Sequence, residues 1–442
     1  MKKIIGFILI LTAVGLVVMS CKKIIEKDPK MVISDQTALT TVEGLQTAII
    51  GTYNALQNGD LYGGNIQACQ DMLTNNVKPS GEGNIVYEET QMLEKNMSPD
   101  NRLSASFWSN AYYVVNMANS IIQAAPGVDM DSSVANPILG ECLFIRAMMT
   151  FDLLRYIGNP NTGMGVPLLT EPTGIEGKPS RAPIEDCYAQ IIADLNQAKA
   201  LLPESNESRA TKWAAYALLA RVYFYHGDYA LAEEEATVVI NSGKFQLDTS
   251  LTSNFSPALN SEIIFAMMST QTNTSCGTLN NYYRKASNGK FSPAPSLIKL
   301  FTFTGGTQDR RFTTFFTNID GKWWTTMFDD RYMNVPLIRL GEVYLTRAES
   351  RFNLGNTVGA LSDLNQTRRR AGLIDTLTID PNQIYYERSK ELVFQGDNFF
   401  NMKRLQKQKI SDDQLPWNDV RLMYLIPQRE MDVNPNLVQN EP

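Results

Sequence analysis

The sequence predicts a mainly α-helical protein, whose scaffold of repeated helix pairs is interrupted by long loop-rich insertions. Residues 336–373 have the apolar spacing of two antiparallel helices joined by a very short turn. Residues 211–241 repeat this pattern 128 positions upstream. Hydrophobic residues make up 43% of the chain, with ordinary numbers of glycine and proline. This composition is typical of a folded globular protein.

The downstream copy shows the pattern most clearly. Its first helix has one face of residues four apart, Leu340, Tyr344, Ala348 and Phe352. Gly355 suits the left-handed residue that follows a helix. A second apolar face begins at a spacing of three, with Val358, Leu361 and Leu364. The small side chains of Ala348 and Ala360 should lie where the two helices approach most closely.

Both copies resemble tetratricopeptide units, in which an aromatic residue, a small residue, a glycine and an alanine recur at fixed spacing. The matching residues are Tyr216, Ala220, Gly227 and Ala232 upstream, and Tyr344, Ala348, Gly355 and Ala360 downstream. Two separated copies indicate a tetratricopeptide-like helical-repeat scaffold with insertions, not a tandem array. Helical repeats usually bind other molecules, so a binding protein is expected.

Charge and composition exclude several functions. The net charge of the 442-residue chain is −6, and an acidic chain has no electrostatic footprint for nucleic acid. His226 is the single histidine, which excludes most histidine-based metal sites and catalytic triads. It precedes Gly227 at a predicted helix end, where a structural role is expected. We therefore predict no catalytic residue, no metal site and no cofactor.

The cysteines show no metal-binding or redox spacing. No two of the five are close enough in sequence for a Cys-x-x-Cys site. Cys142 and Cys187 fall within apolar helical patterns, and we expect them in the core. A disulfide between any two of Cys69, Cys142, Cys187 and Cys276 is left open.

The N-terminus has the pattern of an export signal. Lys2 and Lys3 precede the apolar run 4–18, which is too short to span a bilayer comfortably. The run ends at Ser20-Cys21, as in a bacterial lipobox, so Cys21 is the expected lipidation site. We predict a lipoprotein signal peptide at 1–20, a lipid-anchored tether at 21–34 and a single α domain at 35–442.

Other elements follow along the chain. Helix 42–56 should start at the N-cap Thr41 and bury a face that includes Leu45 and Ile49. Further helices are predicted at 102–125, 133–156, 184–202 and 382–405, the second of them central because it is apolar on most faces. Residues 57–101 are a predicted long loop region, and long loops are usually functional. Residues 158–180 are predicted to be a connection that crosses the surface. The insertion 244–334 is irregular, with a strand-like run at 263–267, and the tail after 415 should be ordered.

Four segments in order give the chain a resemblance to the SusD/RagB family of outer-membrane nutrient-binding lipoproteins. They are Glu141, Phe144, Arg146 and Ala147 with Val166-Pro167-Leu168; Arg339, Glu342, Leu345, Ala348 and Glu349 with Asn365, Arg368, Arg370 and Gly372; Glu387-Arg388, Glu391-Leu392, Gly396 and Arg404; and Ile426-Pro427, Glu430, Asn434-Pro435 and Gln439-Asn440. Gln395, Asn398 and Asn401 depart from the family, which usually has Glu, Arg and Asp there. We interpret these three positions as support for the fold.

The resemblance implies a protein on the outer face of the outer membrane, held by its lipid anchor. Such proteins cap a SusC-like TonB-dependent barrel transporter and deliver captured nutrient to it. The ligand is usually an oligosaccharide and sometimes a peptide. The family has no catalytic activity.

Adjacent aromatic residues in the insertion are the first candidates for the ligand site. Trp323 and Trp324 stand in a polar, glycine-containing loop, and flat rings pack well against the C–H faces of sugars. Tyr282 and Tyr283 are a second pair. For all four residues core packing is the alternative. Trp108 and Trp213 lie in helical patterns and are expected in the core.

Polar contacts could come from residues 71–76. Asp71, Asn75 and Asn76 are candidates because the family often has an acidic or amide group there, and turn formation is the alternative for the two asparagines. Arg368, Arg369 and Arg370 resemble a basic patch, but an internal ion network is the favoured interpretation.

Other functions stay open at this point. A peptide-binding member of the same family differs only in its ligand. A lipid-anchored glycosidase is less favoured, because the chain has 46 acidic residues and no pair in a distinctive setting. A repeat scaffold for membrane assembly is also less favoured, because long aromatic insertions do not suit exposed concave helices.

Overall fold

The computed structural model describes residues 39–174, 176–302, 308–407 and 415–440. The predicted signal peptide, Cys21 and the tether lie outside the described residues. The fold is mainly helical, as the sequence predicts, with few and short strands. Within the described ranges, every helix is too short or too polar to cross a membrane.

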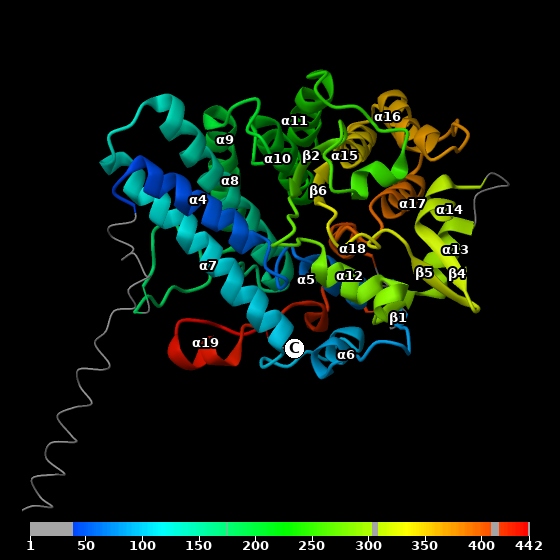
Figure 1. Ribbon diagram of the computed structural model, residues 1–442, viewed down its shortest axis with the longest axis horizontal. Helices are drawn as coiled ribbons and strands as arrows, with labels where there is room; N and C mark the ends of the chain where they lie inside the picture. The colour runs from blue at the N-terminus through cyan, green and yellow to red at the C-terminus, as the bar shows by residue number, and fades with distance from the viewer. Residues whose placement is uncertain (1–38, 175, 303–307, 408–414, 441–442) are drawn as a thin grey trace, which may run out of the picture.

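The scaffold is a stack in which each helix packs against the next (Figure 1). In order, the stack contains α7 (Arg102–Ala124), α8 (Ser132–Ile157), α9 (Ile184–Leu201), α10 (Lys212–His226), α11 (Tyr229–Asn241), α15 (Leu340–Asn353) and α16 (Thr357–Arg370). Helix α4 (Val42–Leu56) packs on α7 and α8, and α17 (Pro381–Glu391) packs on α15 and α16. Helices α11 and α15 are in contact although about a hundred residues separate them in the chain.

The two repeat copies are the helix pairs α10–α11 and α15–α16, which confirms the predicted scaffold. All four alanines of the pattern are buried at the helix contacts. Gly227 and Gly355 have φ angles of 99° and 82°, so both provide the left-handed residue after a helix. The predicted second face of α16 is partly wrong, because Val358 is 81% exposed. Helix α16 instead packs through Ala360, Leu364 and Thr367, which are buried and follow helical spacing.

Two other helices agree with their predicted roles. In α4 the Thr41 hydroxyl accepts a hydrogen bond from the Gly44 amide at 3.1 Å, which makes it the N-cap. Leu45, Ile49, Tyr53 and Leu56 are all buried. Helix α8 is buried along nearly all of its length from Ile138, so it is the centre of the core.

Residues 57–101 are not a continuous loop. They contain α5 (Asn65–Leu73), β1 (Val77–Pro79) and α6 (Tyr87–Leu93). All nine residues of α5 are buried, including Gln67, Gln70 and Asp71. The helix therefore has no solvent-exposed face, and because it is only nine residues long and lies in a glycine- and asparagine-rich stretch, the sequence did not distinguish it from a loop.

The insertion leaves the stack after α11 and returns at α15. It contains η2 (Leu251–Phe255), β2 (Ile263–Met267), α12 (Gly277–Tyr283), η3 (Lys285–Ser287), β3 (Phe291–Pro293), α13 (Pro295–Thr302), α14 (Arg310–Phe315), β4 (Phe316–Ile319), β5 (Lys322–Thr325) and β6 (Val335–Arg339). The strand-like run at 263–267 is β2, as predicted. The strands form antiparallel pairs, β1 with β3, β2 with β6 and β4 with β5.

The predicted helix 382–405 is interrupted. Helix α17 ends at Glu391 and α18 (Asn398–Arg404) begins after a turn in which Phe394 and Gly396 have positive φ. A side chain at Gly396 would come within 2.9 Å of the Gln70 amide nitrogen, so this turn packs closely on α5.

The tail is ordered over its described residues, as predicted. It contains η4 (Val420–Leu422) and α19 (Gln428–Val433). The Tyr424 amide donates to the Tyr156 carbonyl at 2.8 Å, and the Asn440 side chain donates to the Ile157 carbonyl at 2.7 Å. The tail is therefore fixed to the end of the central helix α8.

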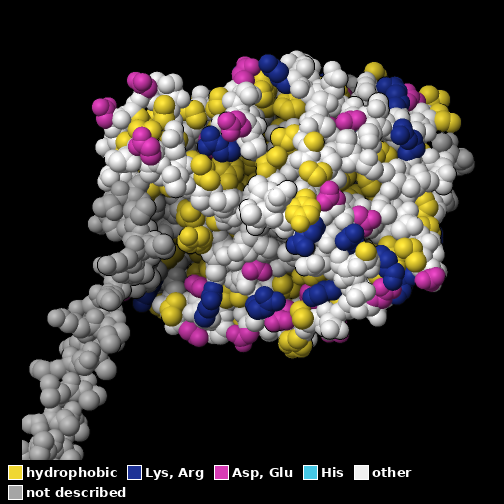
Figure 2. Space-filling view, viewed as in Figure 1, with side chains coloured by type: hydrophobic (Ala, Val, Ile, Leu, Met, Phe, Trp, Pro, Cys, Tyr) yellow, Lys and Arg dark blue, Asp and Glu magenta, His cyan; other side chains and the backbone are white. Residues whose placement is uncertain are grey.

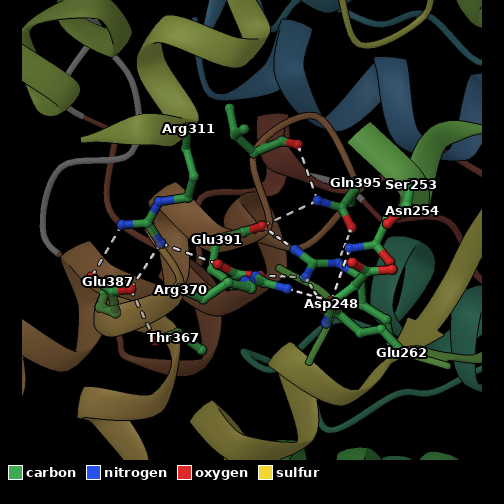
Figure 3. Close-up of polar contacts among 12 residues, drawn as sticks. Asp248, Ser253, Asn254, Glu262, Arg311, Thr367, Arg370, Glu387, Glu391 and Gln395 are labelled. Atoms are coloured by element: carbon green, nitrogen blue, oxygen red, sulfur yellow. Dashed lines mark hydrogen bonds and ion pairs between the residues drawn. The ribbon is translucent and has the colours of Figure 1, made fainter. Parts of the chain in front are cut away.

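A buried ion network joins the insertion to the C-terminal helices (Figure 3). Glu262, next to β2, accepts from Arg339 at 2.8 Å and from Arg370 at the end of α16. Arg370 also bonds Glu391 of α17. Arg370 thus belongs to an internal network, as predicted, and Arg368 lies 4.0 Å from Glu387 of that network. The prediction is wrong for Arg369, which is exposed and pairs with Asp375 at 2.6 Å.

The network continues to α14 through Arg311, which bonds Asp309 and Glu387 at 2.8 Å each. The network contains four carboxylates and four cations. The carboxylates are those of Asp309, Glu262, Glu387 and Glu391, and the cations are Arg311, Arg339, Arg370 and Lys390. The Lys390 ammonium group lies 3.9 Å from Asp309. Because the charges balance, the network can be buried without an unpaired ion.

The neutral residues Gln395 and Asn401 lie beside charged groups. Gln395 accepts from Arg339 at 2.7 Å, and Asn401 accepts from Arg404 at 2.7 Å. Both amides thus hold arginines of the C-terminal helices in place, in agreement with a supporting role in the fold.

Candidate functional site

The two tryptophans of the insertion lie in a hairpin rather than in a loop. Strands β4 and β5 are joined by Asp320 and Gly321, both with positive φ, as a tight hairpin turn requires. Neighbouring residues of a strand point to opposite faces. Trp324 consequently points inward and is only 1% exposed, whereas Trp323 is half-buried and packs on Phe312 with ring centroids 5.1 Å apart.

Tyr282 and Tyr283 are buried at the end of α12. The Tyr282 hydroxyl donates to Asn65 at 3.1 Å, and the Tyr283 hydroxyl donates to Asp71 at 2.9 Å. The Tyr283 ring lies 5.3 Å from that of Phe394. The pair therefore fastens α12 to α5 and to the core.

Asp71 is buried beneath the residues that follow α5. Burial raises the pKa of Asp71 to about 7, against hydrogen bonds from Asn76 and Tyr283 that lower it. Asn76 donates to Asp71 at 3.1 Å. Asn75 has a φ of 54° and accepts a hydrogen bond from Lys95. The two asparagines thus form the turn after α5.

The expectation of an exposed aromatic platform is wrong for Trp324, Tyr282 and Tyr283, and Asp71 is equally out of reach of a ligand. Strand alternation hides Trp324, while α12 is covered on two sides by α5 and β3. Trp323, Asn75 and Asn76 remain partly exposed, and a ligand contact at these three residues stays a prediction.

An open cavity of about 530 Å³ lies beside α12, where three distant segments meet. Its volume is in the range of small-molecule sites. It is lined by Asn54, Ala55, Gln57, Asn58, Gly59, Gly63, Asn110, Tyr113, Thr272, Asn273, Thr274, Gly277, Thr278 and Asn281. None of these lining residues carries a charge. Figure 2 shows this face of the molecule, with a largely white, uncharged surface between α7 and α12.

Glycines bring the end of α4 close to the start of α12. A side chain at Gly59 would lie 2.8 Å from the Thr278 hydroxyl, and one at Gly64 would lie 2.7 Å from the Thr278 Cβ. Gly64 also has a φ of 148°, which favours glycine. The glycine-rich loop 59–64 is therefore what lets this wall of the cavity form.

Hydrogen bonds between amides orient the lining. The Asn273 side chain donates to the side-chain oxygen Oε1 of Gln57 at 2.5 Å, and the Gln57 side-chain nitrogen donates to the Met268 backbone carbonyl at 3.0 Å. Asn54 and Asn281 are exposed, and neither side-chain amide makes a hydrogen bond to another described residue. The cavity thus has a fixed amide framework and two amides whose donors and acceptors are open to a ligand.

Tyr113 supplies an aromatic surface at the rim. It lies on α7 and is 58% exposed. Amides and hydroxyls around one exposed ring offer both hydrogen bonds and a flat apolar face. This combination suits a neutral, hydroxyl-rich molecule.

This cavity was not predicted from the sequence. Its only signal was a high density of Asn, Gly and Thr in 54–63 and 272–281, and nothing in the sequence shows that these segments meet. The first segment overlaps the region 57–101, which was predicted to be functional. Tyr113 lies in a helix that the sequence assigned without a ligand role.

His226 has the structural role that the sequence predicted. It ends α10, with its Nδ1 2.6 Å from Asp228 and its Nε2 2.9 Å from Glu185. Partial burial lowers the pKa of His226, but the hydrogen bonds to these two carboxyl groups outweigh burial and raise it. The contacts tie the end of α10 to the start of α9.

The cysteines of the described ranges are all free and buried. Cys142 and Cys187 are in the core, as expected, and Cys69 and Cys276 are buried as well. Trp108 and Trp213 are also buried. In the part of the chain that the structure describes, no group of three or more His, Cys, Asp or Glu side chains could hold a metal ion.

Two family models match the sequence. One, described as starch-binding associating with outer membrane, matches residues 27–224. The other, described as the SusD family, matches residues 311–442. Their matches include the end of α4, α7 and the C-terminal helices of the ion network, but not the segment 272–281.

Curated relatives carry SusD-like names. SusD-like protein P2 from Formosa agariphila is 30% identical over 243 residues, which are 54% of this chain and 46% of the relative. The chain thus spans about half the length of that relative. A SusD-like protein from Bacteroides ovatus is 26% identical over 89% of this chain and 81% of its own length.

Solved structures share the whole fold. A SusD superfamily protein from Bacteroides thetaiotaomicron is 26% identical, with a TM-score of 0.81 over 91% of this chain and all of its own. A SusD superfamily protein from Bacteroides vulgatus gives the same identity and TM-score over 90% of this chain and 98% of its own. The likeness therefore includes both the stack and the insertion.

Proposed function

Because this chain belongs to the SusD/RagB family, we propose that it is a cell-surface nutrient-binding lipoprotein that captures oligosaccharide and delivers it to a partner TonB-dependent outer-membrane transporter. The observation that carries the proposal is the uncharged cavity between α7 and α12. A sugar presents many hydroxyls that both donate and accept, and amides match them without the cost of burying a charge.

The residues of the cavity take separate roles in this proposal. Tyr113 packs against the apolar face of one sugar ring. Asn54 and Asn281 bind its hydroxyls, while Gln57 and Asn273 keep the wall in shape through their mutual hydrogen bond. The protein binds and releases the sugar unchanged.

Direct binding tests the proposal. The full chain in mild detergent is applied to an array of linear glucan, xylan, mannan, galactan and arabinan oligosaccharides, and hits are measured by titration calorimetry. We expect binding to at least one glycan class, weakened severalfold by Asn281→Ala. Asn288→Ala, in an exposed turn after η3, is the matched control and should bind as the wild type does. If the protein retains peptides and binds no glycan, the proposed ligand would be a peptide and not an oligosaccharide.

Membrane attachment and delivery are separate parts of the proposal. Lipid at Cys21 predicts a mass increase of the processed chain and loss of membrane attachment in Cys21→Ser. Delivery predicts that the chain is isolated together with a barrel transporter. Recovery of assembly machinery in place of a transporter would favour a scaffold role, and turnover of a bound glycan would favour an enzyme.

A further inference from the structure

A second cavity of about 460 Å³ lies on the other side of α7. It is enclosed by α7, by the connection between α8 and α9, and by the tail around α19 (Figure 1). Tyr113 lines both this cavity and the amide cavity. The two cavities are therefore neighbours that share one exposed aromatic side chain.

The exposed face of α7 explains this arrangement. Phe107, Ala111 and Val114 are buried against the core. Asn110, Tyr113 and Asn116 recur at a spacing of three and share the opposite face. Asn110 lines the first cavity and Asn116 the second, and at 1.5 Å per residue they lie about 9 Å apart along the helix. This distance exceeds the length of one sugar ring.

The second cavity has an aromatic floor. The half-buried ring of Tyr112 faces the cavity, and it packs on the buried Trp108 with ring centroids 4.7 Å apart. The Tyr112 hydroxyl is fixed because it donates to the Pro167 carbonyl at 3.0 Å. Immobile rings provide contact area at little cost in conformational entropy.

Polar groups surround that floor. The Asn116 side-chain oxygen accepts from the Thr173 amide at 2.7 Å, which orients its NH2 group as a donor. Arg429, whose side chain is 63% exposed, lies 3.3 Å from Glu430 and donates to Ser109. Donors and acceptors around an aromatic floor match a sugar ring and its hydroxyls.

We propose that the second cavity is a further sugar subsite, so that one oligosaccharide lies across α7 with Tyr113 between its two ends. This inference rests on the proposed function and adds a requirement for ligand length. A disaccharide fills the amide cavity alone, whereas a longer chain reaches both cavities.

Blocking the second cavity tests the inference. Val433 lies on α19, lines this cavity and is 64% exposed, so Val433→Trp adds bulk without disturbing the core. Gly174→Trp blocks the cavity from the connecting segment, where an added Cβ meets no atom within 4 Å. Val358→Trp, on the exposed side of α16, is the matched control.

Affinities for di- and hexasaccharides of the bound glycan class are compared in the full chain. We expect the wild type and Val358→Trp to bind the hexasaccharide at least tenfold more tightly than the disaccharide. Both blocking variants should lose that gain and keep the disaccharide affinity. Thermal unfolding verifies that each variant is folded. Because the two blocking variants lie on different segments, the test still works if one of them fails to fold.

Several results would overturn the inference. Equal affinity of the wild type for both lengths would contradict it, as would blocked variants that keep the tenfold gain. Either result leaves the proposed function standing, provided that the disaccharide binds. If no glycan binds, the proposed function fails and the second subsite fails with it.

Discussion

The network around Glu262 and Arg370 and the cavity between α7 and α12 are both polar, but they are built from different side chains. The network contains carboxylates, guanidinium groups and an ammonium group, nearly all of them buried. The cavity contains amides and hydroxyls that are largely open to solvent.

The difference follows from the cost of removing a charge from water. A buried ion needs a permanent partner, so it cannot be released to a ligand. An amide can exchange water for a sugar hydroxyl at little cost. In this protein, charges hold the insertion to the stack, and neutral groups line the surface that we propose for binding.

The largest effect is expected at Glu391, whose carboxylate bonds Arg370, Arg339 and Arg311. Glu391→Ala should lower the free energy of unfolding by about 3–5 kcal/mol, because the remaining carboxylates no longer balance the buried guanidinium and ammonium groups, and Arg339 and Arg370 then share Glu262 alone. Urea unfolding measures the loss. Glu204→Ala, which removes an exposed ion pair with Lys212, is the control and should leave the midpoint in place. Equal effects of the two changes would contradict the role given to the network.

Asp71 provides the next test, because it is a buried acid that forms no ion pair with a residue of the described ranges. The pKa of Asp71 is about 7 in the folded chain, whereas an ordinary aspartate has a pKa of 3.8. Between these two pH values the folded state keeps a proton that the unfolded state releases. Relative to Asp71→Asn, the wild type should lose up to about 4 kcal/mol of stability as the pH rises from 4 to above 7. Urea midpoints at pH 4.5 and 8 measure this difference. Parallel pH profiles of the two proteins would show that Asp71 has no raised pKa.

Tyr113 tests the proposed binding face. Tyr113→Ala should weaken glycan binding about tenfold, which corresponds to the loss of roughly 1.4 kcal/mol of aromatic contact. Titration calorimetry measures the affinity. Tyr386→Ala is a matched control, because Tyr386 is also a half-exposed helical tyrosine and lines neither cavity. An unchanged affinity in Tyr113→Ala would remove α7 from the proposed site.

The smallest effect is expected at Trp323, on the hairpin. If the amide cavity is the main site, Trp323→Ala should change the glycan affinity less than twofold, since Trp323 does not line that cavity. The same titration decides this. If Trp323→Ala loses as much glycan affinity as Tyr113→Ala, the ligand site would be at the hairpin, as the sequence predicted.

Much of the fold could be predicted because it depends on spacing along the chain. Ala348 and Ala360 marked the close helix contact, and Gly227 and Gly355 marked the helix ends. Helix α5 was not predicted in this way, because it is only nine residues long and the glycine and asparagine residues around it indicate a loop.

The candidate site was less predictable. Trp323 and Trp324 attracted attention as an aromatic pair, but the hairpin register sends them to opposite faces. Tyr113 is one of many tyrosines in the sequence, and only its exposure beside two cavities distinguishes it.

The sequence by itself determined the repeated helix pairs, the central helix α8 and the family resemblance, because these depend on the order and spacing of residues. The tertiary structure alone decided which polar and aromatic side chains are buried and which face solvent. It also decided that the loop after α4 meets α12 beside α7. Burial and contact depend on segments that are distant in sequence, so local patterns cannot specify them.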